Sequence, residues 1–254
     1  MKRMTLIAPA STIFLVSSMS RPNKGDAERI LDVLENLASQ TSVAEKIGQD
    51  ASVMPWLLSR IQQKETPVSQ NKQYSAEILA ILLQSTTANR TKFASLDGVD
   101  VLLQLLSAYR KRDPEKDSDE EEYVENLFDC LTCVVDDDEG KIKFVEAEGV
   151  ELAQIMLKEG KLSKQRALRA LDHALSGQGG VHGCERLVEI AGLRTVFGMF
   201  MKKVSFFSFS FGHAPTNANY VTARDRGRRA SSRDICVLVT SAPRRISSAD
   251  SCAC

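Results

Sequence analysis

The sequence has few aromatic residues and few histidines, and its N-terminal apolar stretch is short. Aromatics make up 6% of the 254 residues, with a single Trp and three His. A core must then be built mainly from Leu, Ile, Val and Ala, which favours helices packed on helices. The apolar stretch from Met4 to Val16 is too short to span a bilayer. We interpret residues 1–23 as an irregular leader.

Catalytic signatures are missing from the sequence. It contains no Gly-rich phosphate-binding loop, no H-E-x-x-H and no G-x-S-x-G. The run GQGG at 177–180 follows an expected helix, not a strand, so we interpret it as a loop. The sequence therefore predicts neither an enzyme nor a bound cofactor.

The six cysteines do not form a regular framework. Cys130 and Cys133 make a C-x-x-C inside the apolar run 127–135, but no second pair and no nearby His completes a zinc-ligand set. We interpret them as buried, reduced thiols, as is usual inside cells, and expect no metal.

Charge is balanced overall but unevenly spread. The formal net charge is zero, whereas residues 204–254 carry seven Arg, no Lys and three Asp, which leaves the preceding part mildly acidic. An acidic body is not built to neutralise many phosphates. We expect no direct nucleic-acid binding by the body and no membrane partner.

Four segments share one pattern, in which a short helix ends in a turn and a strongly apolar helix follows. Their turn residues are Ser52, Gly98, Gly149 and Gly192, spaced 46, 51 and 43 residues apart. Gly suits such a turn because it adopts the left-handed conformation that commonly closes a helix. A further helix is expected before each segment, at 27–39, 74–84, 121–135 and 164–176. Each unit thus contains three helices.

This period is close to that of armadillo and HEAT repeats. A single unit is too small to bury its own apolar face, so neighbouring units must stack. The sequence predicts an all-α fold, a right-handed armadillo-type α-solenoid of about four three-helix repeats with disordered termini. An unrelated helical bundle with accidental similarity is the alternative. The expected repeat domain covers 24–203, with units 24–65, 70–112, 119–160 and 163–203.

The repeat pattern stops after residue 203. Residues 204–211 alternate for part of their length between apolar residues and Ser, which is typical of a strand. We interpret 204–254 as an Arg/Ser-rich, largely disordered tail that does not belong to the repeat domain.

Residues 26–203 resemble the beta-catenin-like protein 1 family, whose members are nuclear armadillo-repeat proteins. The resemblance is carried in order by VLENL, WLL, EILAILLQ, LDGVDVLLQ, ENLFD, ALRALDHA and GLRTVF, at 33–37, 56–58, 77–84, 96–104, 125–129, 167–174 and 192–197. It implies a protein associated with the spliceosome that binds basic, localisation-type segments of splicing factors. The family chain is much longer than this one.

An Asn ladder is one mechanism by which armadillo grooves hold an extended peptide. Asn36 fits the position of such an Asn, but the apparent equivalents Leu82, Cys133 and His173 are not Asn. The ladder is therefore broken, and Asn36 could equally cap or bridge helices.

Acidic side chains that attract a basic segment are the other mechanism. The candidate groove residues are Asn36, Asp129, Asp136, Asp137, Asp138, Glu139, Asp172 and His173. The run 136–139 also precedes a short helix, where helix capping is the alternative role. His173 is more often a packed or surface residue than a functional one.

We therefore predict a non-enzymatic protein-protein interaction scaffold of the nucleus, acting in pre-mRNA splicing. An importin-like transport adaptor and a truncated gene product with little function are the alternatives. Exposed apolar surface at either end of the repeat array would also allow self-association.

Overall fold

The structure, a computed structural model, describes residues 24–201, with side chains from Arg29 onward. The chain divides into two units, Met1–Lys203 and Val204–Cys254. All described residues lie in the first. The leader at 1–23, the strand expected at 204–211 and the disordered tail expected at 204–254 fall outside the described residues.

Residues 24–201 form helices in successive groups of three and contain no strand. The first triplet is α2 (Lys24–Ala38), α3 (Thr41–Gln49) and α4 (Val53–Ile61), and the second is α5 (Gln70–Ser85), α6 (Thr87–Ser95) and α7 (Gly98–Ser107). The third is α8 (Asp119–Val134), α9 (Asp138–Glu146) and α10 (Gly149–Glu159). The fourth is α11 (Leu162–Leu175), α12 (Val181–Glu189) and α13 (Leu193–Met201), with a 3-10 turn η1 (Gln178–Gly180) before α12. The all-α solenoid prediction is confirmed.

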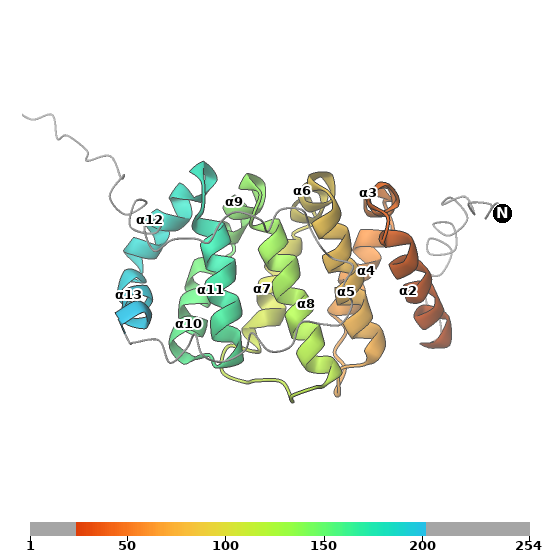
Figure 1. Cartoon of the computed structure of the whole chain (residues 1–254), viewed down its shortest axis with the longest axis horizontal. Coiled ribbons are helices and arrows are strands. Elements are labelled where there is room, and N and C mark those ends of the chain that lie inside the picture. The colour runs from red at the N-terminus through yellow and green to blue at the C-terminus, as the bar shows by residue number, and fades with distance from the viewer. Residues whose placement is uncertain (1–23, 202–254) are drawn as a thin grey trace, which may run out of the picture. The chain divides into compact units, whose positions relative to one another are not determined.

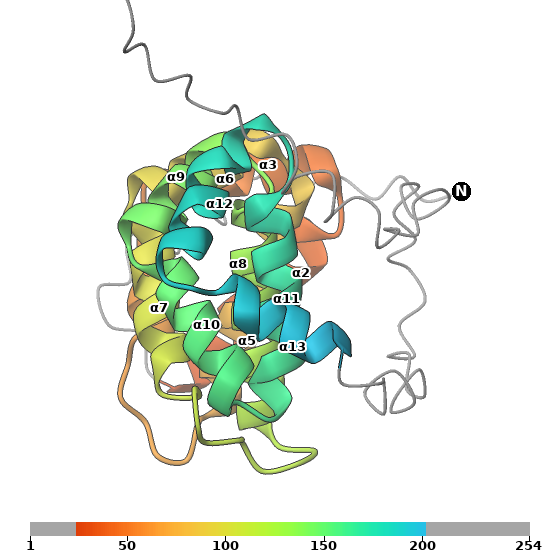
Figure 2. The same ribbon diagram turned by 90° about the vertical axis from the view of Figure 1, so that its left-hand side faces the viewer.

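Equivalent helices of successive triplets lie side by side and form three rows (Figures 1 and 2). The long helices make one row, in which α2 contacts α5, α5 contacts α8, and α8 contacts α11. The short helices α3, α6, α9 and α12 make a second row along one edge, at the top of both views. In the third row α7 contacts α10, and α10 contacts α13.

Side-chain caps fix where the long helices of the second and third triplets begin. The Ser69 side chain accepts a hydrogen bond from the Lys72 amide, and the Ser118 side chain accepts one from the Glu121 amide. Each bond satisfies an amide that has no partner within the helix. Four acidic residues, Asp119 to Glu122, occupy the first turn of α8, where they complement the positive end of the helix dipole.

The core runs through all four triplets and is mainly aliphatic, as the scarcity of aromatics predicts. Tyr123, Phe93 and Phe144 are its largest fully buried side chains. Within the described residues, no helix combines the length and apolar character needed to cross a membrane.

The turns before the third helix of each triplet differ from the expectation. Asp97, Glu148 and Ala191, with φ of 54°, 58° and 56°, adopt the left-handed conformation, and the glycine follows each of them. A Cβ on Gly98 would lie 2.4 Å from the Phe93 ring, and one on Gly149 would lie 2.4 Å from the Phe144 ring. The glycine positions were predicted correctly, but the reason was wrong. Glycine is needed there because a buried side chain of the preceding short helix packs against the turn.

The first of these turns, which has Ser52 in place of Gly, is built differently. Asp50 Oδ1 accepts hydrogen bonds from the Ser52 amide at 2.9 Å and from Ser52 Oγ at 2.5 Å. Ser52 has a φ of −100°, so it is not in the left-handed region. A side-chain turn therefore replaces the glycine contact in this triplet.

Candidate functional site

The row of long helices exposes a surface rich in carboxylates. We call the exposed and half-buried side chains of α2, α5, α8 and α11 the long-helix face. The long-helix face excludes the apolar positions of these helices, such as Leu34, Leu79 and Leu127, which are buried. Its acidic members include Glu35, Glu77, Glu122, Glu125, Asp129 and Asp172.

Glu77 on α5 lies between carboxylates of both neighbouring helices. Its side chain is half-buried, and Gln73 Nε2 donates a hydrogen bond of 3.0 Å to its Oε2. Burial raises the pKa of Glu77, and the negative charges of Glu35 on α2 and Glu122 on α8 raise it further, against the lowering effect of the Gln73 bond. Three adjacent long helices therefore each contribute a carboxylate to one region of negative potential.

A depression of about 220 Å³ lies between α8 and α11. We call it the α8/α11 depression, and it is lined by Glu125, Phe128, Asp129, Thr132, Arg166 and Arg169. Arg166 forms a close ion pair with Glu125, whereas Arg169 Nη1 lies 3.9 Å from Asp129 Oδ1. Burial raises the pKa of Asp129, and the charge of Arg169 partly opposes this.

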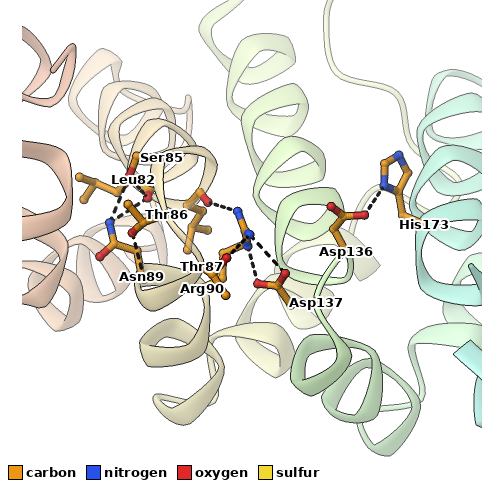
Figure 3. A network of polar contacts seen from close by, with 10 residues as sticks. Leu82, Ser85, Thr86, Thr87, Asn89, Arg90, Asp136, Asp137 and His173 are labelled. Carbon is orange, nitrogen blue, oxygen red and sulfur yellow. Dashed lines mark hydrogen bonds and ion pairs between the residues drawn. The ribbon is translucent and has the colours of Figure 1, made fainter. Parts of the chain in front are cut away.

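The acidic run 136–139 lies at the α8/α9 junction and the start of α9 (Figure 3). Asp137 Oδ2 accepts a hydrogen bond of 2.5 Å from Arg90 Nε on α6, and its Oδ1 accepts one of 3.2 Å from Arg90 Nη2. Asp137 occupies the N-cap position of α9, but its side chain makes no capping hydrogen bond. Its main contact therefore joins two successive repeats.

The other residues of this run have weaker contacts. His173 Nδ1 lies 3.4 Å from Asp136 Oδ1, and this contact links the C-terminal end of α11 to the segment that follows α8 (Figure 3). Asp138 Oδ1 lies 3.8 Å from Lys141 Nζ one turn later. Glu139 and Asp172 are exposed and make no hydrogen bond or ion pair within the part of the chain that the structure describes. Asp129 and Asp172 are the predicted acids that lie on long helices.

Asn36 is exposed on α2, and its Nδ2 donates a hydrogen bond of 2.7 Å to the Asp32 carbonyl of the same helix. Leu82, which the sequence suggested as its counterpart on α5, is fully buried and so does not occupy a comparable surface position. Cys133 is half-buried on α8. These positions do not form a matching row on the surface, because the outward side of each helix is set by its own packing.

Asn89, which sequence reasoning missed, joins the first two repeats. Its fully buried Nδ2 donates to the carbonyls of Ala44 at 3.2 Å and Leu82 at 2.9 Å, and its Oδ1 accepts from Gln49 Nε2 at 3.1 Å. Figure 3 shows its contacts with Leu82 and Ser85. Its role is structural, since a buried amide must find partners.

Sequence reasoning also missed the charged residues of the long-helix face. These are Glu35, Glu77, Glu122, Glu125, Arg166 and Arg169. Their spacing of three or four residues along α8 and α11 is the signal that could have found them, because such residues share one side of a helix.

Of the two cysteines of the C-x-x-C motif, Cys130 lies in the seam between α5 and α8. Cys130 is fully buried, with its Sγ 3.7 Å from the Ala76 carbonyl, and burial raises the pKa of its thiol. Burial, together with the charge of Asp129, raises the pKa of Cys133 to about 11. Both thiols are therefore protonated at neutral pH. Among the described residues, no group of three or more His, Cys, Asp or Glu side chains could hold a metal ion.

Comparison with known structures supports the fold. A crystal structure of an engineered protein superimposes with a TM-score of 0.59 at 20% sequence identity, covering 77% of this chain and 74% of that one. At this identity the similarity concerns the fold alone.

Comparison with known sequences identifies the family. The beta-catenin-like protein 1 of Homo sapiens is 41% identical over 172 residues, or 68% of this chain, and the homologue of Schizosaccharomyces pombe is 40% identical over 174 residues. The chain spans about 30% of the length of these relatives. Residues 5–214 match the family described as "Catenin-beta-like, Arm-motif containing nuclear". The chain belongs to this catenin-beta-like family of armadillo-motif proteins.

Proposed function

We propose that this chain is a non-enzymatic scaffold that binds a basic segment of a partner protein on its long-helix face. The observation that carries the proposal is the set of carboxylates on adjacent long helices, with Glu77 between Glu35 and Glu122. Uncompensated like charges raise each other's free energy, and a Lys- or Arg-rich segment would relieve this repulsion.

The nuclear location and the splicing role rest on the family. Its description contains the word nuclear. The resemblance that is visible in the sequence adds splicing factors with basic, localisation-type segments as partners. The armadillo architecture supports protein binding in general, because a row of parallel helices offers an extended surface.

Peptide binding tests the proposal. A fluorescein-labelled peptide with six basic residues is titrated with the full chain and followed by fluorescence anisotropy. Binding is expected at 0.05 M salt and much weaker binding at 0.5 M, because salt screens exposed charges beyond a Debye length of roughly 10 Å already at 0.1 M. A peptide of the same length with neutral residues should not bind.

Charge-reversed variants locate the surface. Glu35→Lys with Glu122→Lys should weaken binding of the basic peptide by more than tenfold. The matched control, Glu45→Lys with Asp100→Lys, changes net charge equally on α3 and α7, outside the row of long helices. Equal losses in both double variants would indicate a general charge effect and would contradict the proposed surface.

Asp137 is unsuitable for this charge-reversal experiment, although the sequence predicts it as a groove residue. Reversing its charge would break the ion pair with Arg90 and so disturb the contact between two repeats. Any loss of binding would then be mixed with a loss of stability.

A further inference from the structure

Asp129 is a weakly paired carboxylate next to open space. Its Oδ1 is 3.9 Å from Arg169 Nη1, too far for a hydrogen bond, whereas the neighbouring Glu125 is in close contact with Arg166. The α8/α11 depression beside it measures about 220 Å³, well above the roughly 10–15 Å³ that one water molecule needs. A long side chain can therefore enter the depression and approach Asp129.

The chemistry of the depression favours a guanidinium group. Burial penalises the charged form of Asp129, so this carboxylate gains from any cation that pairs with it more closely than Arg169 does. A planar guanidinium can donate two parallel N–H bonds to one carboxylate, which an ammonium group cannot do. The chain's own side chains already place a guanidinium opposite each of the two acids in the depression.

The charges around the depression also favour a cationic group. The two arginines of the depression are opposed by Glu125 and Asp129. Asp113 and Glu121 also act on Arg166. Carboxylates thus outnumber guanidinium groups around this space, which disfavours an anionic group such as a phosphate.

We propose that Asp129 binds an Arg side chain of the partner segment, and that Arg169 competes with it for Asp129 in the free protein. This inference rests on the proposed function and deepens it, because it names one subsite and the side chain that fills it. Arg169 then acts as an internal competitor, so removing it and removing Asp129 have opposite effects on affinity.

The test measures Kd of the full chain for two labelled peptides, one with three Arg and one with three Lys at the same positions. Asp129→Asn should weaken binding of the Arg peptide by about tenfold, equivalent to about 1.4 kcal/mol. Arg169→Gln should tighten it by about threefold, a smaller effect because the pair that it removes is loose. The preference for Arg over Lys should disappear in Asp129→Asn.

Two controls remove equal charges elsewhere. Glu45→Gln removes an exposed carboxylate of α3, outside the row of long helices, and Lys158→Gln removes an exposed cation of α10. Thermal melting followed by circular dichroism checks that each variant is folded.

The outcomes separate the subsite from the proposed function. If wild type binds the Arg peptide but Asp129→Asn behaves like Glu45→Gln, the subsite is wrong and the basic-segment function stands. If Arg169→Gln weakens binding, the depression takes an anionic group and the inference fails. If wild type binds neither peptide, both proposals fail together.

Discussion

At position 98, a Cβ would lie 2.4 Å from the ring of Phe93, which is itself fully buried. The same relation joins Gly149 to Phe144, five residues earlier in each case. The turn between the second and third helices thus needs both the buried Phe ring and a glycine, which has no side chain to collide with that ring. Close packing of the buried ring leaves no volume for a methyl group.

Gly98→Ala should lower the free energy of unfolding by about 1–3 kcal/mol, the usual cost of overpacking a tight site. Urea denaturation followed by far-UV circular dichroism measures it. Gly198→Ala is the control, since a Cβ there meets nothing within 4 Å and the residue lies inside α13. It should be neutral or stabilising by about 0.5–1 kcal/mol, because Ala favours the helix more than Gly does. Similar losses in both variants would rule out the proposed role of the Phe93 contact.

Glu77 predicts a pH dependence of stability. Because its folded pKa is raised above the unfolded value, its contribution to stability is complete below the unfolded pKa and is lost as pH rises through the folded pKa. Glu77→Gln should therefore be more stable than wild type at pH 7, with the difference shrinking toward pH 4. Urea midpoints at both pH values test this.

An exposed carboxylate serves as the comparison for Glu77. Glu45→Gln removes an exposed side chain in the middle of α3 that makes no described contact, so its stability should stay close to that of wild type at both pH values. A Glu77→Gln variant less stable than wild type at pH 7 would mean that the neighbouring charges stabilise the face.

Among the helices, the ion pair between α6 and α9 is the clearest polar link between repeats. The side chains of Arg90 and Asp137 are only 17% and 24% exposed, and Arg90 also donates to the Leu83 carbonyl and Thr87 Oγ1 (Figure 3). A two-point pair with little solvent around it is worth more than a surface pair.

A double-mutant cycle of Arg90→Met and Asp137→Asn should give a coupling energy of about 1–2 kcal/mol. Lys111–Glu159 is the matched pair at the surface, with side chains 66% and 44% exposed. The cycle of Lys111→Met and Glu159→Gln should give less than about 0.5 kcal/mol. Both are measured by urea denaturation, and equal couplings would contradict the role of Arg90 and Asp137 as a link between repeats.

Helix positions were largely predictable from the sequence, because apolar residues three and four apart mark the buried side of a helix whatever its neighbours are. The expected helix 74–84 is found at Gln70–Ser85, with its start moved to the Ser69 cap. The candidate site was less predictable. The sequence gives no sign that Asp137 faces Arg90, 47 residues away, or that Glu35, Glu77 and Glu122 come together, since both facts depend on how repeats pack.

For the repeat array as a whole, stability should vary along its length. The inner long helices α5 and α8 pack against long helices on both sides, whereas α13 has no buried residue and exposes Phe200 and Met201 at 64% and 74%. In repeat arrays, each unit is stabilised mainly by its immediate neighbours.

Hydrogen–deuterium exchange with mass spectrometry should therefore find the slowest amide exchange in α5 and α8 and the fastest among the helices in α13. Helix α10 is the internal comparison, because it holds the same place in the preceding triplet and buries Val150, Met156 and Leu157. Equal protection of α10 and α13 would show that the array opens only as a single cooperative unit.

The burial of Cys130 between α5 and α8 makes this seam chemically observable. A thiol reagent attacks a thiolate, and burial between α5 and α8 raises the pKa of the Cys130 thiol, so labelling should be slow while the second and third repeats stay packed. The labelling rate of Cys130, measured on the proteolytic peptide that contains it, would therefore report how often the contact between α5 and α8 opens in the wild-type chain. A slow rate would mean that the contact between α5 and α8 holds the two middle repeats firmly together.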